Sequence, residues 1–370
     1  MAPSDRLLMG PGPSNIYPEV SEALSRPLLG HLDPEFLEVL DETCERLRQV
    51  FGTSNALTLP LSGTGSAGME AAFVNFVRPG DPVVIGVNGM FGERMCEVAS
   101  RLGAEVVRVE APWGEPLDPA EVLSAHPNPR LIALVHAETS TGVRNDILEI
   151  GAAKGDALLV VDMVTSLGGM EVRVDDWEVD VAYSGTQKCL GVPPGLSPVT
   201  VSERARTRMV SRPTSWYLDL GLISRYVEAG GGRTYHHTAP VTMVVALQAG
   251  LGVILEEGIA NVQKRHEYCG RMLQEGLEDM GLELVAPPTH RLAQLTTAYV
   301  PEDLLEFPGG EASVRRELLE RFGIEIGAGV GSMAGRVWRI GCMGHTARER
   351  NVVTLLGALG SVLGRRSHRG

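Results

Sequence analysis

The sequence predicts an α/β fold with a mainly parallel sheet that helices cover on both faces. Apolar segments expected to be strands alternate with segments expected to be helices. The strand segments are 57–61, 82–87, 104–109, 130–137 and 157–164. Strands separated by helices form right-handed βαβ units, whose strands run parallel. These segments are also almost continuously apolar, which is typical of parallel strands buried on both faces.

A glycine-rich loop joins the first of these strands to a helix expected over residues 66–77. Gly63, Gly65 and Gly68 match the pattern G-x-G-x-x-G. The free N–H groups and the dipole at the start of such a helix favour an anion, although an ordinary tight turn is the alternative. Thr64 and Ser66 add hydroxyl donors, so we expect a phosphate group to bind there.

The remaining elements of the first two thirds follow the same alternation. Helices are expected over residues 34–51, where apolar residues recur at helical spacing, and over 91–102, 118–125 and 145–155. Residues 7–20 interleave glycine and proline, so this segment is expected to be extended. One more strand is expected near residues 197–203.

The last third of the chain predicts a smaller α+β domain. Long helical stretches cover residues 241–281, and further strands and helices are expected at 282–286, 295–300, 312–322, 337–341 and 347–364. We therefore expect an extended segment that lines the active site, a large domain and a small C-terminal domain. Their bounds are 1–15, 16–255 and 256–370.

Composition and charge argue against several classes of function. The 370 residues include 33 basic and 46 acidic ones, a net charge of -13, so nucleic acid and anionic membranes are unexpected partners. The five cysteines are scattered, and His236 and His237 would face opposite ways on a strand, so no metal site is expected. The sequence shows neither a signal peptide nor an apolar run near the roughly 20 residues that cross a bilayer. We expect a cytoplasmic enzyme.

Lys188 stands just beyond a short apolar run at residues 181–183, inside a turn that ends in Pro193, Pro194 and Gly195. In an α/β protein, ligands bind at the carboxyl ends of the strands. A lysine held against apolar neighbours can lose its charge and attack a carbonyl group, the Schiff-base role. A solvated surface lysine is the alternative that this window alone leaves open.

Three other residues at expected strand ends, and one arginine within an expected strand, could serve a ligand. Asp162 ends a buried strand, where a carboxylate needs a cation or several donors. Phe91 could stack on a flat ring or belong to the core, and Thr139 could line a pocket or cap a segment. Arg339 interrupts an apolar run, so it pairs with a buried acid or binds a substrate carboxylate. With Lys188 and the phosphate loop, these are the groups that a pyridoxal phosphate enzyme requires.

At these positions the chain resembles a known family, the class V aminotransferases of pyridoxal phosphate fold type I. The similar motifs occur in family order over nearly the whole chain: LLMGPGPSN, LTLPLSGTGSAGMEAA, GVNGMFGER, HAETSTGV, VVDMVTSLGG, AYSGTQKCLGVPPG, YHHTAPV and WRIGCMG. The alanine–glyoxylate and serine–pyruvate (serine–glyoxylate) branch is the most similar. The resemblance implies a large domain that binds pyridoxal 5′-phosphate and a homodimer with shared active sites.

The resemblance also implies a role for each matching residue. Lys188 would be the Schiff-base lysine and proton carrier, and Asp162 the partner of the pyridine nitrogen. Arg339, with the Gly12 backbone nearby, would bind the substrate carboxylate. The remaining implied cofactor contacts are the phosphate residues Thr64, Gly65, Ser66 and Gln187, the ring neighbours Phe91, Val164 and Thr139, and Tyr235 and Thr238 from the second subunit.

The reaction implied is a ping-pong transamination from a small amino acid, alanine or serine, to glyoxylate or pyruvate. Two residues differ from the animal branch, which has tryptophan in place of Phe91 and histidine in place of Ser66; these differences blur the substrate assignment. A pyridoxamine–pyruvate aminotransferase would replace the polar phosphate residues with an acid. A non-catalytic protein of this fold would have little reason to keep the lysine, aspartate and arginine together.

Two further alternatives involve other chemistry. A cysteine desulfurase needs a cysteine between Glu325 and Arg339, where the sequence has none. An NAD-dependent oxidoreductase built on the glycine loop needs an acid at the end of the second strand, where Asn88 stands.

Overall fold

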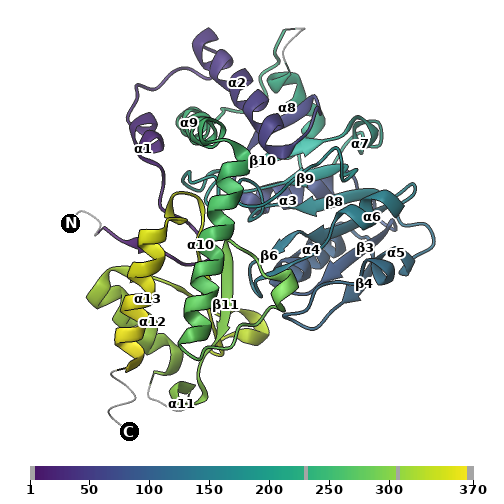
Figure 1. Ribbon diagram of the computed structural model, residues 1–370. Coiled ribbons are helices and arrows are strands. Elements are labelled where there is room, and N and C mark those ends of the chain that lie inside the picture. Colours follow the sequence, from purple (N-terminus) through teal and green to yellow (C-terminus); the bar gives the residue numbers. More distant parts are fainter. Residues whose placement is uncertain (1–4, 229–231, 306–308, 365–370) are drawn as a thin grey trace.

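The computed structural model describes residues 5–228, 232–305 and 309–364, and its central feature is a seven-stranded sheet (Figure 1). The strand order is β2-β10-β9-β8-β5-β3-β4. The strands are β2 (Leu57–Ser62), β3 (Pro82–Val87), β4 (Glu105–Glu110), β5 (Leu131–Val135), β8 (Leu158–Asp162), β9 (Val181–Tyr183) and β10 (Leu196–Val201).

All neighbouring strands of this sheet are parallel except β10, which runs antiparallel to both β2 and β9. Every residue of β5, β8, β9 and β10 is buried. Because successive side chains of a strand point to opposite faces, the sheet must be covered on both sides. The predicted α/β fold with a mainly parallel, doubly covered sheet is confirmed.

The register of the central strands aligns their carboxyl ends. Val135 pairs with Asp162 across β5 and β8, and Asp162 pairs with Tyr183 across β8 and β9. The segments that leave these three strands therefore start at one edge of the sheet.

Helices of the first two thirds surround the sheet. They are α1 (Pro18–Leu24), α2 (Pro34–Phe51), α3 (Gly65–Val74), α4 (Met90–Arg101), α5 (Pro119–Ser124), α6 (Leu148–Ala153), α7 (Glu203–Arg206), α8 (Leu220–Val227) and α9 (Val241–Glu257). α2 has the predicted bounds because a capping residue lies at each of its ends. The Asp33 side chain accepts from the Glu35 N–H, and Gly52 ends the helix with a φ of 63°.

The C-terminal part has its own hydrophobic cluster, in which Leu273, Trp338 and Leu355 are buried. It contains α10 (Ile259–Asp279), α11 (Glu302–Leu305), α12 (Gly310–Phe322), α13 (Glu349–Gly364) and a sheet of order β11-β14-β13. These strands are β11 (Leu295–Tyr299), β14 (Val337–Gly341) and β13 (Gly327–Ala328). The expected strand at 282–286 is wrong, because only a single bridge joins Leu284 to Ala298.

The N-terminal segment links the two parts; it is extended up to Tyr17, as predicted, but the prediction is wrong for residues 18–20, because α1 begins at Pro18. β1 (Leu7–Leu8) pairs with β12 (Ile324–Glu325), and buried Met9 belongs to the C-terminal cluster. Further along, the Ser14 N–H donates to the Gln187 carbonyl oxygen at 2.9 Å. Residues 9–14 thus cross from the C-terminal part to the turn that contains Lys188.

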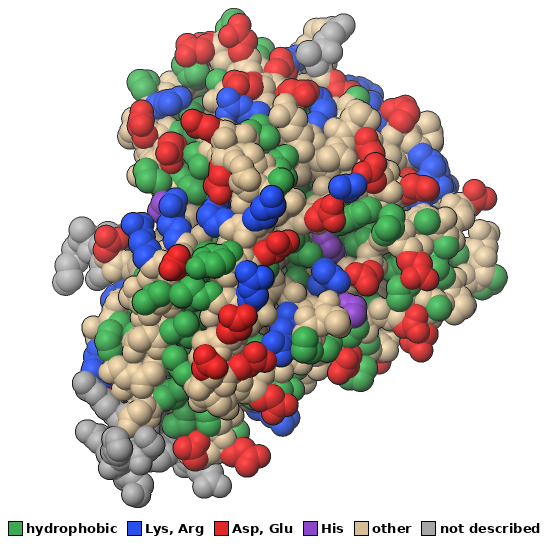
Figure 2. Space-filling model, viewed as in Figure 1, with side chains coloured by type: hydrophobic (Ala, Val, Ile, Leu, Met, Phe, Trp, Pro, Cys, Tyr) green, Lys and Arg blue, Asp and Glu red, His purple; other side chains and the backbone are tan. Residues whose placement is uncertain are grey.

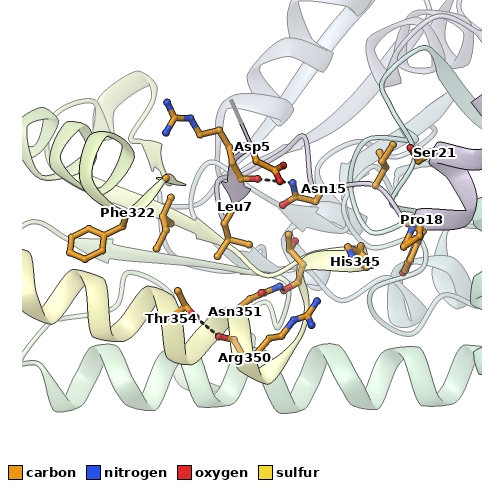
Figure 3. A pocket seen from close by; sticks show the side chains of 16 residues that line it. Asp5, Leu7, Asn15, Pro18, Ser21, Phe322, His345, Arg350, Asn351 and Thr354 are labelled. Atoms are coloured by element: carbon orange, nitrogen blue, oxygen red, sulfur yellow. Dashed lines mark hydrogen bonds between the residues drawn. The ribbon is translucent and has the colours of Figure 1, made fainter. Parts of the chain in front are cut away.

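A pocket of about 570 Å³ lies between this segment and α13 (Figure 3). Asn15 from the segment and Asn351 and Thr354 from α13 face it. None of the predicted site residues lines it.

Charged side chains of both signs are interspersed over the face shown in Figure 2. In the described part of the chain, no single helix is long and apolar enough to cross a membrane, and α9 and α10 reach that length only as a pair bent by 86°.

Candidate active site

Lys188 lies in a rigid turn beyond the carboxyl end of β9. The Thr186 hydroxyl donates to the Pro193 carbonyl oxygen at 2.6 Å, and the Gly191 N–H donates to the Lys188 carbonyl oxygen at 3.1 Å. The side chain is buried, with 8% of the residue exposed. Burial and, to a smaller extent, the Arg339 cation lower the pKa of Lys188 to about 8, against the opposing effects of Cys189 and Asp162. A large neutral fraction is therefore present in mildly alkaline solution.

The N-terminal segment closes over this amine. Lys188 Nζ donates to the Pro11 carbonyl oxygen. Gly12 has a φ of +107°, and a Cβ at this position would lie 2.6 Å from Lys188 Nζ. Position 12 therefore needs glycine both for its backbone conformation and for the space that the lysine occupies.

Asp162, the last residue of β8, is buried beside Lys188. One carboxylate oxygen, Oδ1, accepts from the Val164 N–H at 2.8 Å. Burial raises the pKa of Asp162 to about 6, while the Val164 N–H, Tyr183 and Lys188 act in the opposite direction. The Tyr183 hydroxyl also acts on this carboxylate from the neighbouring strand. A buried carboxylate beside a lysine is suited to a protonated ligand nitrogen.

The glycine loop leads into α3 as predicted, with Thr64 as N-cap and Gly63 at a φ of 122°. Thr64 makes no side-chain capping bond, and both Thr64 and Ser66 are exposed. The Ala67 N–H donates to the Thr64 carbonyl oxygen, but the N–H groups of Gly65 and Ser66 have no partner among the described residues and can bind an anion. Nearby, Gln187 Oε1 is buried and has no hydrogen-bond partner among the described residues.

Two apolar side chains border the space between this loop and Asp162. A Cβ on Gly65 would lie 2.9 Å from Val164 Cγ2, so the valine packs directly against the loop. Phe91, in the first turn of α4, is half-buried, and the Arg94 guanidinium lies 5.0 Å from its ring centroid. Arg94 Nη1 also donates to Ser66 Oγ at 3.4 Å, which links the Phe91 side to the loop.

Arg339, on β14, reaches the site from the C-terminal part. Its Nε donates to the Ala328 carbonyl oxygen at 2.7 Å and its Nη1 to the Thr139 carbonyl oxygen at 3.3 Å. Burial lowers the pKa of Arg339, and the Glu138 carboxylate opposes that shift. Thr139 itself is buried, next to β6 (Ala137–Glu138). Nη2 of Arg339 has no hydrogen-bond partner among the described residues, which leaves it available for a carboxylate.

Tyr235 and Thr238 are placed differently from the other predicted residues. Both are exposed, and the Tyr235 hydroxyl lies 3.3 Å from Thr238 Oγ1. In the described part of this chain, the only other ring contact of Tyr235 is with His31, at 5.2 Å between centroids. In the part of the chain that the structure describes, no hydrogen bond or ring contact joins these two residues to Lys188 or Asp162.

Sequence reasoning overlooked Glu138 and Ser140. Both are completely buried and hydrogen-bonded to each other beside Thr139. The motif HAETSTGV that suggested Thr139 contains both residues, but their partners lie far away in the sequence, at Met90 and Phe91.

Comparison with known proteins identifies the family to which this chain belongs. A family model described as Aminotransferase class-V matches residues 13–343. The (S)-ureidoglycine–glyoxylate transaminase of Bacillus subtilis is 38% identical over 97% of this chain and 90% of its own length. The alanine–glyoxylate aminotransferase of Drosophila melanogaster is 39% identical over 97% of this chain and 92% of its own length.

Solved structures agree with these relatives. The crystal structure of an alanine–glyoxylate aminotransferase from Nostoc sp. superposes with a TM-score of 0.93 at 45% identity, over 98% of this chain and 96% of that one. Fold, site and relatives together define a pyridoxal 5′-phosphate enzyme of fold type I. The chain belongs to the class V aminotransferases, as the motifs predicted, and the interpretation of the glycine loop as a dinucleotide site is wrong.

The residues present fit this cofactor. The orphaned Gln187 Oε1 and the N–H groups of Gly65 and Ser66 at the start of α3 are polar groups without a partner among the described residues, and the Asp162 carboxylate is buried beside them. The absence of a side chain at Gly65 keeps the loop against Val164. A phosphorylated pyridine aldehyde offers a group for each of them.

Proposed function

We propose that this aminotransferase transfers the amino group of a small amino acid, alanine or serine, to glyoxylate or pyruvate. The observation that carries the proposal is the buried amine of Lys188, held beside both Asp162 and the guanidinium of Arg339. The names of the relatives support a glyoxylate acceptor, since the bacterial and the animal proteins share it while their donors differ.

Lys188 would hold the cofactor and carry a proton. When bound, pyridoxal 5′-phosphate supplies an electrophilic aldehyde and a ring that accepts electrons. Lys188, about half of it neutral near pH 8, would attach to the aldehyde and, once released, move a proton at the substrate α-carbon. Asp162 would keep a proton on the ring nitrogen, and its burial strengthens that ion pair.

Arg339 would orient the substrate. Two of its nitrogens are fixed by backbone carbonyl groups, so the guanidinium plane is held before a substrate arrives. Nη2 would donate to the substrate carboxylate, with the Gly12 backbone nearby against Lys188. A fixed carboxylate sets which bond of the α-carbon faces the cofactor ring.

The other predicted residues would bind the cofactor without taking part in proton transfer. The N–H groups after Thr64, together with Gly65, Ser66 and Gln187, would bind the phosphate. Phe91 and Val164 would pack on the two faces of the ring, and Thr139 would contact the ring hydroxyl.

We also propose a homodimer in which Tyr235 and Thr238 complete the phosphate site of the second subunit. The support is a cluster of large apolar side chains that one subunit leaves exposed around these residues. They are Leu28 (75% exposed), Leu32 (52%), Trp216 (60%), Tyr217 (45%) and Tyr235 (52%). Such a patch favours burial against another protein surface.

Hybrid dimers test the shared site. A Lys188→Ala subunit is mixed with a Tyr235→Ala/Thr238→Ala subunit after reversible dissociation. If these residues act across the interface, each hybrid has one intact site and activity returns above that of either parent. If they act within their own subunit, both sites stay damaged and mixing restores nothing, which would contradict the proposal.

A half-reaction panel tests the transferase proposal. The purified holoenzyme is mixed with alanine, serine or (S)-ureidoglycine, and loss of the aldehyde absorbance is followed; glyoxylate or pyruvate is then added. Fast conversion with alanine or serine supports the proposal, and conversion with ureidoglycine alone contradicts the donor assignment. Borohydride reduction and peptide mass mapping identify the attached amine. The chain has only three lysines, Lys154, Lys188 and Lys264, so the mapping is unambiguous.

A further inference from the structure

Glu138 is a completely buried carboxylate beside the active site, and none of the roles above uses it. It is the last residue of β6, immediately before Thr139. Burial raises the pKa of Glu138, but the N–H and O–H groups around it oppose that change. A carboxyl group in such a place is costly unless donors surround it, so its partners show what it stabilises.

The partners of Glu138 come from two separate segments. Oε1 accepts from the Ser140 N–H at 3.0 Å and from the Ser140 hydroxyl at 2.6 Å. Oε2 accepts from the Phe91 N–H at 3.1 Å, across 47 positions of sequence. Ser140 Oγ in turn accepts from the Met90 N–H at 2.9 Å. The carboxylate thus ties the Thr139 turn to the start of α4.

The N–H groups of Met90 and Phe91 are the first two of α4, which have no partner inside the helix. A serine, threonine or aspartate at the N-cap usually provides one, but the N-cap here is Gly89, which has no side chain. A Cβ on Gly89 would lie 2.4 Å from Cδ of Glu138 and 2.4 Å from Oγ of Ser140. Gly89 therefore leaves the space in which a remote residue caps the helix.

Two residues predicted to contact the cofactor, Phe91 and Thr139, lie next to the Glu138 carboxylate. The ring of Phe91 extends from the capped turn of α4, and Thr139 adjoins Glu138 in the chain. Arg339 also contacts this turn, since its Nη1 donates to the Thr139 carbonyl oxygen. A change in the distance between α4 and the turn would therefore move the ring, the hydroxyl and the guanidinium relative to one another.

We propose that Glu138 is a positioning residue: as the remote cap of α4, it fixes the Phe91 ring and the Thr139 turn around one bound cofactor. The proposal rests on the roles proposed above for Phe91 and Thr139. Glu138 itself touches no reacting atom in this scheme and acts through its neighbours.

The test measures the affinity of the apoprotein for pyridoxamine 5′-phosphate, which cannot attach to Lys188 and so reports on noncovalent binding alone. Glu138→Gln keeps the shape of the side chain but gives it an N–H₂ group that faces donors. We expect its affinity, per folded molecule, to fall about tenfold, the effect of losing one hydrogen bond to a charged group. Ser140→Ala removes only the relay to Met90 and should give a smaller fall.

Asp180→Asn is the matched control. Asp180 is also buried and holds backbone and side-chain donors, but it lies at the start of β9, at the other end of the sheet. The Asp180→Asn substitution should lower the melting temperature and leave the affinity for pyridoxamine 5′-phosphate unchanged. If Glu138→Gln and Ser140→Ala behave in the same way as Asp180→Asn, Glu138 is merely structural and the proposal is wrong.

A double-mutant cycle with Phe91→Leu locates the effect. If Glu138 acts through the ring, the loss of affinity caused by Glu138→Gln should shrink in the Phe91→Leu background. Equal losses in both backgrounds would contradict the proposal. Wild-type protein in the same series must bind the cofactor and transaminate; its failure would refute the proposed function instead, so the two failures are distinguishable.

Discussion

The two ends of the central sheet both contain buried charged groups, but only one end leaves them with unmet partners. At the amino end, Asp180 accepts from the Leu159 N–H at 2.9 Å and binds Arg204 at 2.7 Å. Lys154, with the same exposed fraction as Lys188, donates to Gly151 and to Glu178. At the carboxyl end, Lys188 donates to the Pro11 carbonyl oxygen, Asp162 accepts from the Val164 N–H, and both have shifted pKa values.

The difference between the two ends distinguishes buried charged groups that stabilise the fold from buried charged groups that are available to a ligand. A satisfied buried ion pair adds little beyond fixing its own geometry, and removing one member mainly costs stability. A group left with an unused donor or acceptor costs the fold free energy until a ligand binds. Substitutions at the two ends should therefore have opposite consequences.

The largest expected effect separates the two buried lysines. Lys188→Ala should reduce turnover by more than about a thousandfold, because a proton carrier and the point of attachment are both lost. Lys154→Ala should lower the melting temperature and leave kcat unchanged. Steady-state kinetics and thermal melts of both variants provide the measurement. Equal losses of turnover in the two variants would contradict the proposed difference between the two ends of the sheet.

The two arginines provide the next comparison. Arg339→Gln should lower kcat/KM for the amino donor about 10- to 100-fold, mostly through KM, since a charge-assisted hydrogen bond to the carboxylate is lost. Arg204→Gln should leave KM unchanged while it weakens the Asp180 ion pair. If the KM of Arg339→Gln is unchanged, the substrate carboxylate binds to a group other than Arg339.

Asp162 and Asp180 should differ in how their replacement changes the free energy of unfolding of the apoprotein. Because the folded pKa of Asp162 lies at about 6, above the usual 3.8, its contribution to stability is full below pH 3.8 and is lost as pH rises through 6. Asp162→Asn should thus become more stable than wild type by up to about 3 kcal/mol at pH 7, with no gain at pH 3.5. Asp180→Asn should be less stable at pH 7, and urea titrations at both pH values decide.

The smallest effect concerns pH. The rate at which apoprotein attaches pyridoxal 5′-phosphate should rise with pH around a midpoint of about 8, as Lys188 loses its proton. Because the Arg339 cation lowers that pKa, Arg339→Gln should move the midpoint upward. An unchanged midpoint would show that burial sets the pKa of the lysine without Arg339, and a downward shift would contradict the effect assigned to Arg339.

Much of the fold was predictable because its signals are local. The alternation of apolar and helical segments placed the strands of the central sheet, and the ends of β8 and β9 placed Asp162 and Lys188 on one edge. α1 was missed because Pro18 was taken as part of an extended segment, although proline at the first position favours a helix.

The groups that sequence reasoning missed depend on distant contacts. Glu138 caps a helix 47 positions away, and no local pattern reveals that. His236 and His237 do not face opposite ways, since their Nδ1 atoms lie 2.7 Å apart outside any strand. The roles implied for the site residues remain predictions, and those of Tyr235 and Thr238 depend on a surface that one chain does not provide.

The short N-terminal crossing has a mechanical consequence. At one end, Met9 is hydrogen-bonded to Gly341, two residues beyond Arg339; at the other, Ser14 Oγ donates to the Lys188 carbonyl oxygen at 2.8 Å. Residues 9–14, which lie between these two hydrogen bonds, connect the C-terminal part to the turn that contains Lys188. A movement of the C-terminal part would be transmitted through this stretch to the turn that contains Lys188, so we expect the positions of the Arg339 guanidinium and the Lys188 amine to be coupled through the chain itself.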